Sequence, residues 1–215
     1  MVVDLENLRQ EYRSSPLDIE DVDKNPLQQF KKWFAEVLDV GLLEPNAMIL
    51  STATPDGKPS ARTVLLKGLA DDGFAFYTNY NSRKGKEIEE NPFACLVFLW
   101  LELQRQVRIE GIIEREESAK STAYFQNRPR GSQIGAWASP QSDVIENRSV
   151  LEEAVRHWEA KYAEVENLPR PAHWGGYVLK ANRLEFWQGR ENRLHDRIQY
   201  SLQEDGSWKI ERLAP

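Results

Sequence analysis

Residues that bind metals or form covalent cross-links are scarce in this sequence. Its 215 residues include one cysteine and three histidines. A single cysteine excludes an intramolecular disulfide and a zinc site made of several cysteines. Cys95 lies within the apolar run FACLVFLWL, where a free cysteine is typically a small buried hydrophobe. No sequence motif for a metal is present, and we expect no metal site.

Long apolar runs are absent as well. The longest, residues 93–101, is far shorter than the roughly 20 residues that cross a bilayer as a helix. The stretch MVVDLENLRQEY at the start contains acidic residues and lacks the apolar core of a secretory signal. We therefore expect a cytoplasmic protein that does not bind membranes.

Positive charge is not in excess. The chain has 28 Lys and Arg residues against 34 Asp and Glu residues, which gives a net charge of −6. General nucleic-acid binders carry a basic surface, so we expect no nucleic-acid partner. Any anion-binding site must then be a local concentration of Lys and Arg.

Nucleotide-binding and repeat signatures are also missing. The sequence has no GxGxxG or P-loop motif, no internal repeat and no strand–helix–strand alternation, and its spacing supports no Ser-His-Asp triad. It does have two blocks of short strand-like segments joined by tight turns, which favour antiparallel pairing. The sequence predicts a single domain over residues 1–215, mainly β with α, built as an antiparallel barrel with peripheral helices.

Local signals place the elements. Asn25 can cap a helix, Pro55-Asp56-Gly57 can turn the chain between two strands, and Ser82 can cap a second helix. The expected helices cover 3–13, 25–43, 82–92, 117–128 and 148–166; the expected strands lie within 47–69 (two), 74–79, 93–101, 104–116 and 175–213 (three short ones); and 124–142, with two glycines and two prolines, is expected to be largely loop.

Basic residues recur at the ends of these elements. Arg62 and Lys67 bracket one apolar strand centre, and because side chains alternate, both can serve one site only if the strand twists, bulges or ends there. After Ser82, Arg83 and Lys84 occupy the positive end of a helix dipole, a conflict that a bound phosphate would remove. Charges that simply face water are the alternative in both places.

Two later stretches are rich in hydrogen-bond donors. The sequence RLHDR, read as a strand, places Arg193, His195 and Arg197 on one face, where three potential cations repel one another. His195 alone is weak evidence of function, because a lone histidine is more often structural. The other stretch contains Tyr124, Arg128, Arg130, Ser132, Gln133, Gln141 and Ser142.

Cations and neutral donors at strand ends, on at least four separate segments, indicate a small anionic ligand. The aromatic residues Tyr77, Tyr124 and Trp187 suit a planar ring. Two phosphorylated planar molecules, a cofactor and a substrate, explain the pattern better than one.

These segments together resemble the pyridoxamine 5′-phosphate oxidase family. The resemblance covers nearly the whole chain and rests on seven or more stretches in order: LRQEY, RTVLLK, FYTNYNSRKGKEIEENP, LQRQV, YFQNRPRGSQIGAWAS, WGGY, EFWQGRENRLHDR and RLAP. It implies an FMN-binding split β-barrel and a homodimer with FMN in the cleft between subunits. The FMN-binding residues that it implies are Arg62, Thr63, Val64, Leu65, Leu66, Lys67, Tyr77, Thr78, Arg83, Lys84, Gln106, Gln141, Ser142, Trp187 and Arg197.

The resemblance also implies the substrates, pyridoxamine 5′-phosphate and pyridoxine 5′-phosphate, which O2 oxidises through FMN to pyridoxal 5′-phosphate with release of H2O2. Arg193 and His195 are implied as catalytic residues beside the substrate ring. The N-terminal segment, residues 1–24, is implied as a cover of the site. The implied substrate-binding residues are Arg9, Tyr12, Lys67, Tyr124, Arg128, Ser132, Arg193 and His195.

Two alternatives stay open: a split-barrel flavin reductase with another substrate, and a non-catalytic FMN-binding protein. The residues implied for the substrate discriminate between the readings, because a bare flavin binder would not need Tyr124, Arg128 or Ser132.

Overall fold

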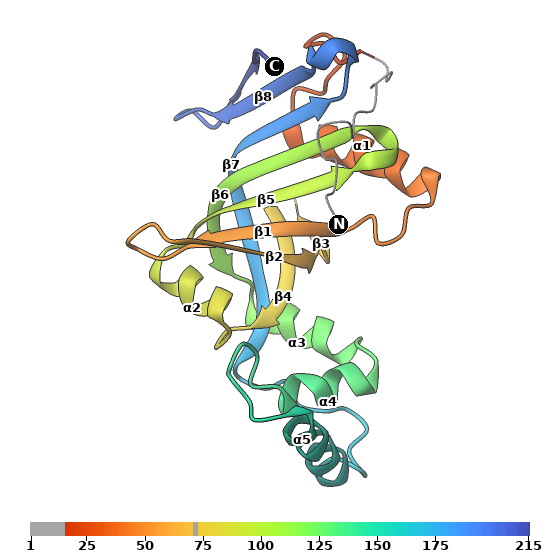
Figure 1. Cartoon of the computed structure of the whole chain (residues 1–215), viewed down its shortest axis with the longest axis vertical. Helices are drawn as coiled ribbons and strands as arrows, with labels where there is room; N and C mark the ends of the chain where they lie inside the picture. Colours follow the sequence, from red (N-terminus) through yellow and green to blue (C-terminus); the bar gives the residue numbers. More distant parts are fainter. Residues whose placement is uncertain (1–15, 71–72) are drawn as a thin grey trace, which may run out of the picture. The chain divides into compact units, whose positions relative to one another are not determined.

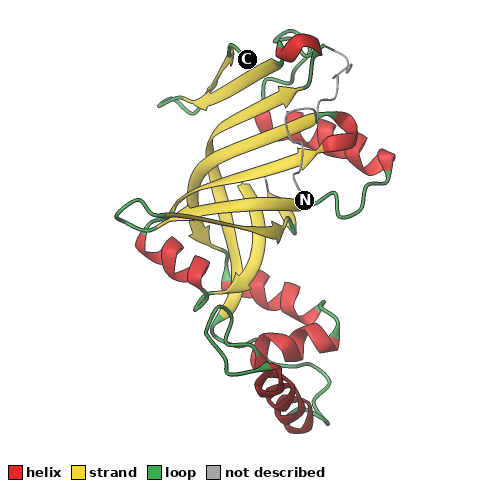
Figure 2. Ribbon diagram, in the orientation of Figure 1, coloured by secondary structure: helices red, strands yellow, loops and turns green. Residues whose placement is uncertain are grey.

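The structure is a computed structural model that describes residues 16–70 and 73–215. Strands dominate it, and helices flank them (Figure 2). The expected helix over 3–13 lies outside the described residues. The helices are α1 Pro26–Val40, α2 Arg83–Glu90, α3 Ser118–Gln126, α4 Arg130–Ala138 and α5 Arg148–Lys161; the strands are β1 Ala47–Ala53, β2 Pro59–Leu65, β3 Gly68–Ala70, β4 Gly73–Asn79, β5 Phe93–Trp100, β6 Arg105–Arg115, β7 Trp174–Gln188, β8 Asp196–Leu202 and β9 Trp208–Arg212 (Figure 1).

The strands form one sheet in the order β2-β1-β5-β6-β7-β4-β3, and β8 pairs with both β7 and β9. The pairs β3–β4, β4–β7, β7–β8 and β8–β9 are antiparallel. Strand β2 ends this order. The expected antiparallel, mainly β fold with peripheral helices is confirmed, and β3 is a short strand that the sequence analysis did not predict.

The chain forms two compact units. Of the described residues, the first unit comprises 16–49, Cys95–Glu110 and Ala181–Pro215, and the second comprises 50–70, 73–94 and Gly111–Lys180. The single domain over 1–215 stays a prediction. Among the described residues, no helix has the length and apolar character needed to cross a membrane.

Helix α1 closes the core of the first unit. The side chain of Asn25 caps it by accepting from the Leu27 N–H at 2.9 Å, and Gly41 ends it at φ 73°. Its buried face packs on strands: Phe30 lies 5.0 Å from Phe98 of β5 between ring centroids, and Trp33 lies 5.2 Å from Phe186 of β7. These two aromatic contacts hold α1 against β5 and β7.

The sequence RLHDR does not form one strand, so the expectation that Arg193, His195 and Arg197 share a strand face is wrong. Residues Glu191–Arg193 form a 3-10 turn, and β8 begins only at Asp196. Asn192 and Arg193 adopt left-handed φ angles of 55° and 61°, which an extended strand does not contain. The chain therefore turns where a strand was expected.

The second unit contains the β1–β2 hairpin, β4, and helices α2 to α5. Gly57 turns the hairpin at φ 83°, as the Pro55-Asp56-Gly57 signal predicts. The Ser82 side chain caps α2 by accepting from the Gly85 N–H at 3.3 Å. Helices α3, α4 and α5 follow one another in Figure 1 and surround an apolar cluster of Phe125, Ile134, Ala136, Leu168 and Trp174.

Helix α4 corrects the expectation that 124–142 is largely loop. The Gln133 amide donates to the carbonyl oxygens of Phe125, Gln126 and Arg128, so the turn before the helix has its acceptors satisfied. Ile134 is buried against the apolar cluster. Packing on that cluster outweighs the low helix propensity of the two glycines.

Candidate active site

A cavity of about 400 Å³ lies within the second unit. Its walls come from the end of β2, from β4, from the start of α2 and from the α3 region, which are far apart in sequence. Trp174 is the lining residue that the sequence analysis missed. The lining residues are Arg62, Thr63, Val64, Leu65, Lys67, Tyr77, Thr78, Lys84, Tyr124, Arg128, Gln141 and Trp174.

Arg62 and Lys67 both reach the cavity because strand β2 ends at Leu65. Beyond that point the alternation of faces no longer applies, and the Lys67 N–H donates to the Ala75 carbonyl at 2.8 Å. One chain is therefore enough to bring these two cations together. Leu66 lies between them, is 8% exposed and does not line the cavity.

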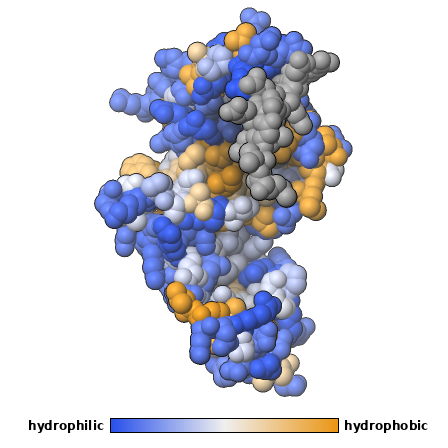
Figure 3. All heavy atoms as spheres, in the orientation of Figure 1, coloured by the Kyte–Doolittle hydropathy of each residue, from blue (hydrophilic) through white to orange (hydrophobic). Residues whose placement is uncertain are grey.

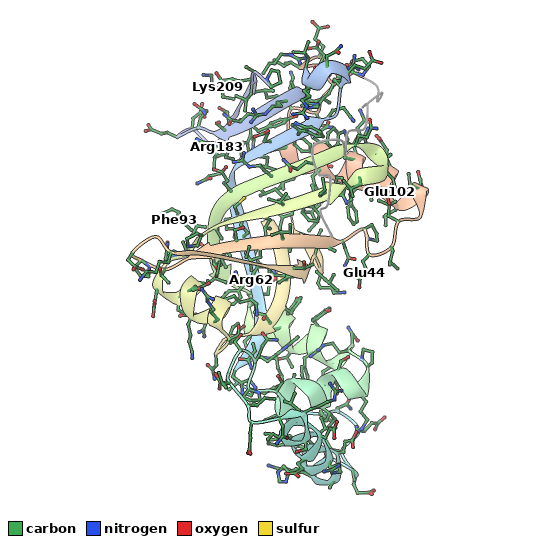
Figure 4. The ribbon with its side chains drawn as sticks, in the orientation of Figure 1. Glu44, Arg62, Phe93, Glu102, Arg183 and Lys209 are labelled. Carbon is green, nitrogen blue, oxygen red and sulfur yellow. The ribbon has the colours of Figure 1, made fainter. Side chains whose placement is uncertain are left out.

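Hydrogen bonds to neighbouring residues hold the Arg62 side chain in place. It lies on β2 (Figure 4), and its two terminal nitrogens donate to four protein oxygens. The first nitrogen donates to the Leu50 carbonyl at 3.2 Å and to Thr52 Oγ1 at 2.6 Å. The second donates to Ser60 Oγ and to Glu87 Oε2, the latter at 3.2 Å. This network fixes the guanidinium before any ligand binds.

Glu87 is the acidic centre of that network, and the sequence analysis missed it. The residue is 4% exposed and accepts hydrogen bonds from Thr52, Ser60, Arg62 and Arg83. Burial alone would raise its pKa, but the Ser60, Thr52 and Arg83 hydrogen bonds and the Arg62 charge lower the pKa to about 2. Glu87 is therefore ionised across the physiological range. Its i,i+4 spacing from Arg83 was the available sequence signal.

Lys84 lines the cavity, and none of the carboxylates in 16–70 and 73–215 forms an ion pair with it. Its Nζ donates to Gln141 Oε1 at 2.8 Å, and to Thr78 Oγ1 and Ser82 Oγ at 3.2 Å each. Burial and then the nearby Arg62 charge lower the pKa of Lys84 to about 8, against a smaller opposite effect of Glu87. Three neutral oxygens thus orient a cation that an anion would stabilise further.

Arg83 and Ser142 lie at the margin. The Arg83 side chain is 65% exposed, donates from Nε to Glu87 Oε1 at 2.8 Å and does not line the cavity. Ser142 follows the lining residue Gln141, is exposed and has a left-handed φ of 77°. Neither residue is in the wall, although both are in the predicted site.

Aromatic rings form the other end of the cavity. Tyr77 and Tyr124 stack with 3.9 Å between centroids and 13° between planes. Trp174 lies nearly parallel to both, at 5.7 Å from Tyr77 and 6.2 Å from Tyr124. Burial is the main cause of the raised pKa values of the two tyrosines, so both stay neutral donors at ordinary pH.

Arg128 sits over this stack. Its guanidinium carbon lies 4.5 Å from the Trp174 ring centroid, a cation–π distance. One of its terminal nitrogens, Nη1, is buried and has no hydrogen-bond partner among the described residues. Burial lowers the Arg128 pKa, and the residue remains charged at neutral pH. Ser132, in the first turn of α4, is half-buried and does not line the cavity.

The remaining predicted residues belong to the first unit, except Arg9 and Tyr12, which lie outside the described residues. Trp187 and His195 are in ring contact at 4.5 Å between centroids. Arg197 donates to Glu185 from Nε at 2.8 Å and from Nη2 at 3.1 Å, and Gln106 is half-buried on β6. Arg193 ends the 3-10 turn that precedes β8.

His195 has a defined tautomer. Its Nδ1 accepts from the Arg190 N–H at 3.1 Å, so the neutral ring carries its proton on Nε2. Burial, and then the Arg193 charge, lower the His195 pKa. The lowered pKa keeps the imidazole mainly neutral at pH 7.

Comparison with known proteins matches two successive stretches of the chain to family models. Residues 34–162 match the family described as pyridoxamine 5′-phosphate oxidase, and residues 174–215 match the pyridoxine 5′-phosphate oxidase C-terminal dimerisation region. A pyridoxine/pyridoxamine 5′-phosphate oxidase of Salinibacter ruber is 56% identical over 98% of this chain and 99% of its own. One of Rubrobacter xylanophilus is 54% identical over 99% of this chain and 97% of its own.

Solved structures share the fold. PhzG from Burkholderia lata, in complex with tetrahydrophenazine-1-carboxylic acid, superposes with a TM-score of 0.87 at 31% identity, over 94% of this chain and 99% of its own. A pyridoxamine 5′-phosphate oxidase-related, FMN-binding protein from Nostoc punctiforme gives 0.68 at 18% identity, over 86% of this chain and 97% of its own. The predicted split-barrel fold and the predicted family are confirmed. The chain belongs to the pyridoxamine 5′-phosphate oxidase family.

Proposed function

We propose that this protein oxidises pyridoxamine 5′-phosphate and pyridoxine 5′-phosphate to pyridoxal 5′-phosphate, with FMN as cofactor and O2 as electron acceptor. The observation that carries the proposal is the cavity of the second unit. Arg62, Lys67, Lys84 and Arg128 line it, and none of its lining residues is acidic. Four cations around one cavity fit two phosphate dianions, one on the cofactor and one on the substrate.

The chemistry of the donors fits FMN at one end of the cavity. Arg62 is oriented by internal hydrogen bonds, Lys84 is held by neutral oxygens, and Arg83 lies beside them at the start of α2. We assign the FMN phosphate to these three residues. Further FMN contacts are assigned to Thr63, Val64, Leu65, Leu66, Lys67, Tyr77, Thr78, Gln106, Gln141, Ser142, Trp187 and Arg197.

The other end of the cavity fits the substrate phosphate. Arg128 lines the cavity, lies over the Trp174 ring and forms no ion pair with a described carboxylate, so a phosphate can serve as its counter-anion. Tyr124 and Lys67 line the same cavity. We assign the substrate phosphate to Arg128, Tyr124, Lys67 and Ser132, and we assign Arg9 and Tyr12 to a cover over the bound substrate.

The chain's own residues would bind and orient the two ligands, and FMN, when bound, would supply the two-electron oxidation of the substrate at its C4′ carbon, with O2 reduced to H2O2. Arg193 orients C4′, and the neutral His195 donates from Nε2 to the substrate. With the amine substrate the oxidised product is an imine, which water hydrolyses to the aldehyde and ammonia.

A second copy of the chain completes the site in this proposal. Residues 174–215, which include Trp187, Arg193, His195 and Arg197, match the dimerisation region of the family. In the first unit, Leu99 and Leu101 are 52% and 68% exposed, although most of the face drawn in Figure 3 is hydrophilic. Exposed leucines of this kind favour a protein interface, and we infer a homodimer.

The purified protein tests the proposal directly. It should be yellow or take up FMN, and it should release H2O2 from pyridoxamine 5′-phosphate and pyridoxine 5′-phosphate but far less from unphosphorylated pyridoxamine. Uptake of FMN without peroxide release would favour the flavin-binding or flavin-reductase alternative. A colourless protein that takes up no FMN would contradict the proposal as a whole.

The role of Arg193 has its own test. Arg193→Ala should lower kcat by about 100-fold, because an orienting contact acts in the transition state, whereas its effect on the KM for the substrate should be smaller. An unchanged kcat in steady-state peroxide assays would contradict the orienting role.

A further inference from the structure

One carboxylate lies directly behind the cations assigned to the FMN phosphate. Glu87 of α2 bonds to Arg62 at 3.2 Å and to Arg83 at 2.8 Å, and it is absent from the cavity wall. Thr52 of β1 and Ser60 of β2 also donate to it. Donors from three elements thus converge on one buried charge, on the side of Arg62 away from any ligand in the cavity.

This carboxylate offsets a repulsion that the empty cavity contains. Arg62, Arg83 and Lys84 are close in space, and the charge of Arg62 disfavours the ammonium form of Lys84 while that of Glu87 favours it. No other carboxylate among the described residues forms an ion pair with Arg62 or Arg83. Without a bound anion, Glu87 is therefore their main electrostatic partner.

We propose that Glu87 is an internal counter-anion that stabilises the phosphate-binding cations while the cofactor is absent, and that the bound phosphate takes over this role. The inference rests on the assignment of FMN to this end of the cavity. The Arg83 side chain is 65% exposed, so it can leave Glu87 for a phosphate at little cost. Glu87 then stabilises the empty form more than the loaded form, and it weakens FMN binding rather than strengthening it.

A carboxylate with a purely structural role would behave differently. Its removal would destabilise the empty and loaded proteins equally and would leave FMN affinity unchanged. Removal of a counter-anion destabilises mainly the empty protein, and by linkage the FMN affinity rises by the same factor. The difference between the two forms is therefore the diagnostic quantity.

The test compares wild type with Glu87→Gln, with FMN removed and with FMN added in excess. The Tm of the FMN-free protein should be about 10 °C lower in Glu87→Gln than in wild type, as expected when one partner of a buried ion pair is lost. The Tm of the FMN-loaded protein should fall by less than half of that amount. Titration of flavin fluorescence should show FMN binding tighter than in wild type, by up to about tenfold, whereas riboflavin, which lacks the phosphate, should show no such change.

Glu89→Gln is the matched control. Glu89 lies two residues further along α2 and pairs with Arg115 at 2.6 Å, outside the cavity. The fall in Tm caused by Glu89→Gln should be small, and it should be equal in the FMN-free and FMN-loaded proteins. Glu87→Asp keeps the charge and serves as the milder variant if Glu87→Gln does not fold in either form, with the same unequal loss expected on a smaller scale.

Equal losses with and without FMN, or FMN binding by Glu87→Gln that is unchanged or weaker, would overturn the inference and leave the proposed function intact. Failure of the wild-type protein to take up FMN would instead overturn the proposed function, and the inference with it.

Discussion

The two ends of the cavity hold their arginines in different ways. At the β2 end, Arg62 donates to four protein oxygens, one of them on the buried Glu87. At the aromatic end, Arg128 lies over Trp174 and forms no ion pair with a described carboxylate. The first end has an internal counter-anion, whereas among the described residues the second has only a neutral ring against its cation.

This difference matches a resident ligand and an exchanging one. An arginine with internal partners keeps its geometry between turnovers, and its binding energy is not needed to order the site. An arginine held by a neutral ring keeps its hydrogen-bonding capacity for each arriving substrate. Four predictions, in decreasing size of effect, test this contrast.

The largest effect is expected at the aromatic end. Arg128→Met should raise the KM for pyridoxamine 5′-phosphate about 100-fold, the size of a lost charged hydrogen bond of roughly 3 kcal/mol. Its kcat and its FMN affinity should stay within about threefold of wild type, because the phosphate lies away from the reacting carbon. Arg130→Met is the control, since Arg130 donates to the Tyr162 and Val165 carbonyls outside the cavity. A comparable KM change in both variants would contradict the assignment.

The second prediction concerns pH at the β2 end. A bound phosphate stabilises charged Lys84, whose pKa in the empty protein is about 8, so FMN binding takes up a proton above that pH. The Kd for FMN should rise toward tenfold per pH unit above pH 8 and stay flat between about pH 6.5 and 7.5, where the FMN phosphate is ionised. Fluorescence titration measures it. Lys84→Arg, which stays charged, should remove the rise, and a pH-independent wild type would contradict the role of Lys84.

The lowered pKa of Lys84 also makes the stability of the FMN-free protein depend on pH. Higher pH raises this stability, whereas it weakens FMN binding. The Lys84 pKa lies below the value of 10.5 expected in the unfolded chain, so the unfolded chain binds more protons between pH 8 and 10.5. Lys84 therefore adds to the stability of the FMN-free protein as pH rises through that window.

A smaller effect is expected for the ring beneath Arg128. Trp174→Leu removes the cation–π contact and should raise the KM for the phosphorylated substrate about fivefold, in line with a contact of roughly 1 kcal/mol. Trp174→Phe keeps an aromatic face and should recover most of that loss. If both variants raise KM equally in peroxide assays, Trp174 only fills space.

The smallest effect is expected behind Arg62. Ser60→Ala removes one donor to Glu87, so the Glu87 pKa should rise from about 2 and the FMN-free protein should lose about 1 kcal/mol of unfolding free energy. Urea unfolding at pH 7 measures the loss. Because the depressed pKa of Glu87 adds stability above pH 4.5 that is lost as pH falls toward 2, wild type and variant should converge in acid. A loss of FMN affinity of more than threefold in Ser60→Ala would contradict the proposed difference between the two ends of the cavity.

The sequence predicts elements well where short-range chemistry decides them. Asn25 and Ser82 cap their helices as expected, and Gly57 turns its hairpin, because each signal acts within a few residues. Helix α4 was missed because its stability comes from the apolar cluster and from Gln133, whose partners lie up to eight residues away. The turn at Asn192 and Arg193 was missed because non-glycine residues rarely adopt left-handed φ.

Most residues that line the cavity were also named from the sequence, since they follow a family pattern, and their role as a site stays a prediction. Two contributors were not named. Glu87 looks like one of many surface acids in an amphipathic helix, and only the approach of β1 and β2 makes it buried. Trp174 begins a strand and would pass as core, since its contact with Arg128 spans 46 residues of chain. Such contacts depend on tertiary structure and leave no local signature.

The position of β2 at the end of the strand order has a consequence for how the site can change over evolutionary time. The lining stretch Arg62 to Leu65 lies on this terminal strand, with one backbone edge not paired in the described sheet. A flat heterocycle can be read there by main-chain N–H and C=O groups, which every residue except proline presents alike. Val64 and Leu65 can then drift in side chain while recognition persists, so sequence variability at these positions is compatible with an unchanged ligand.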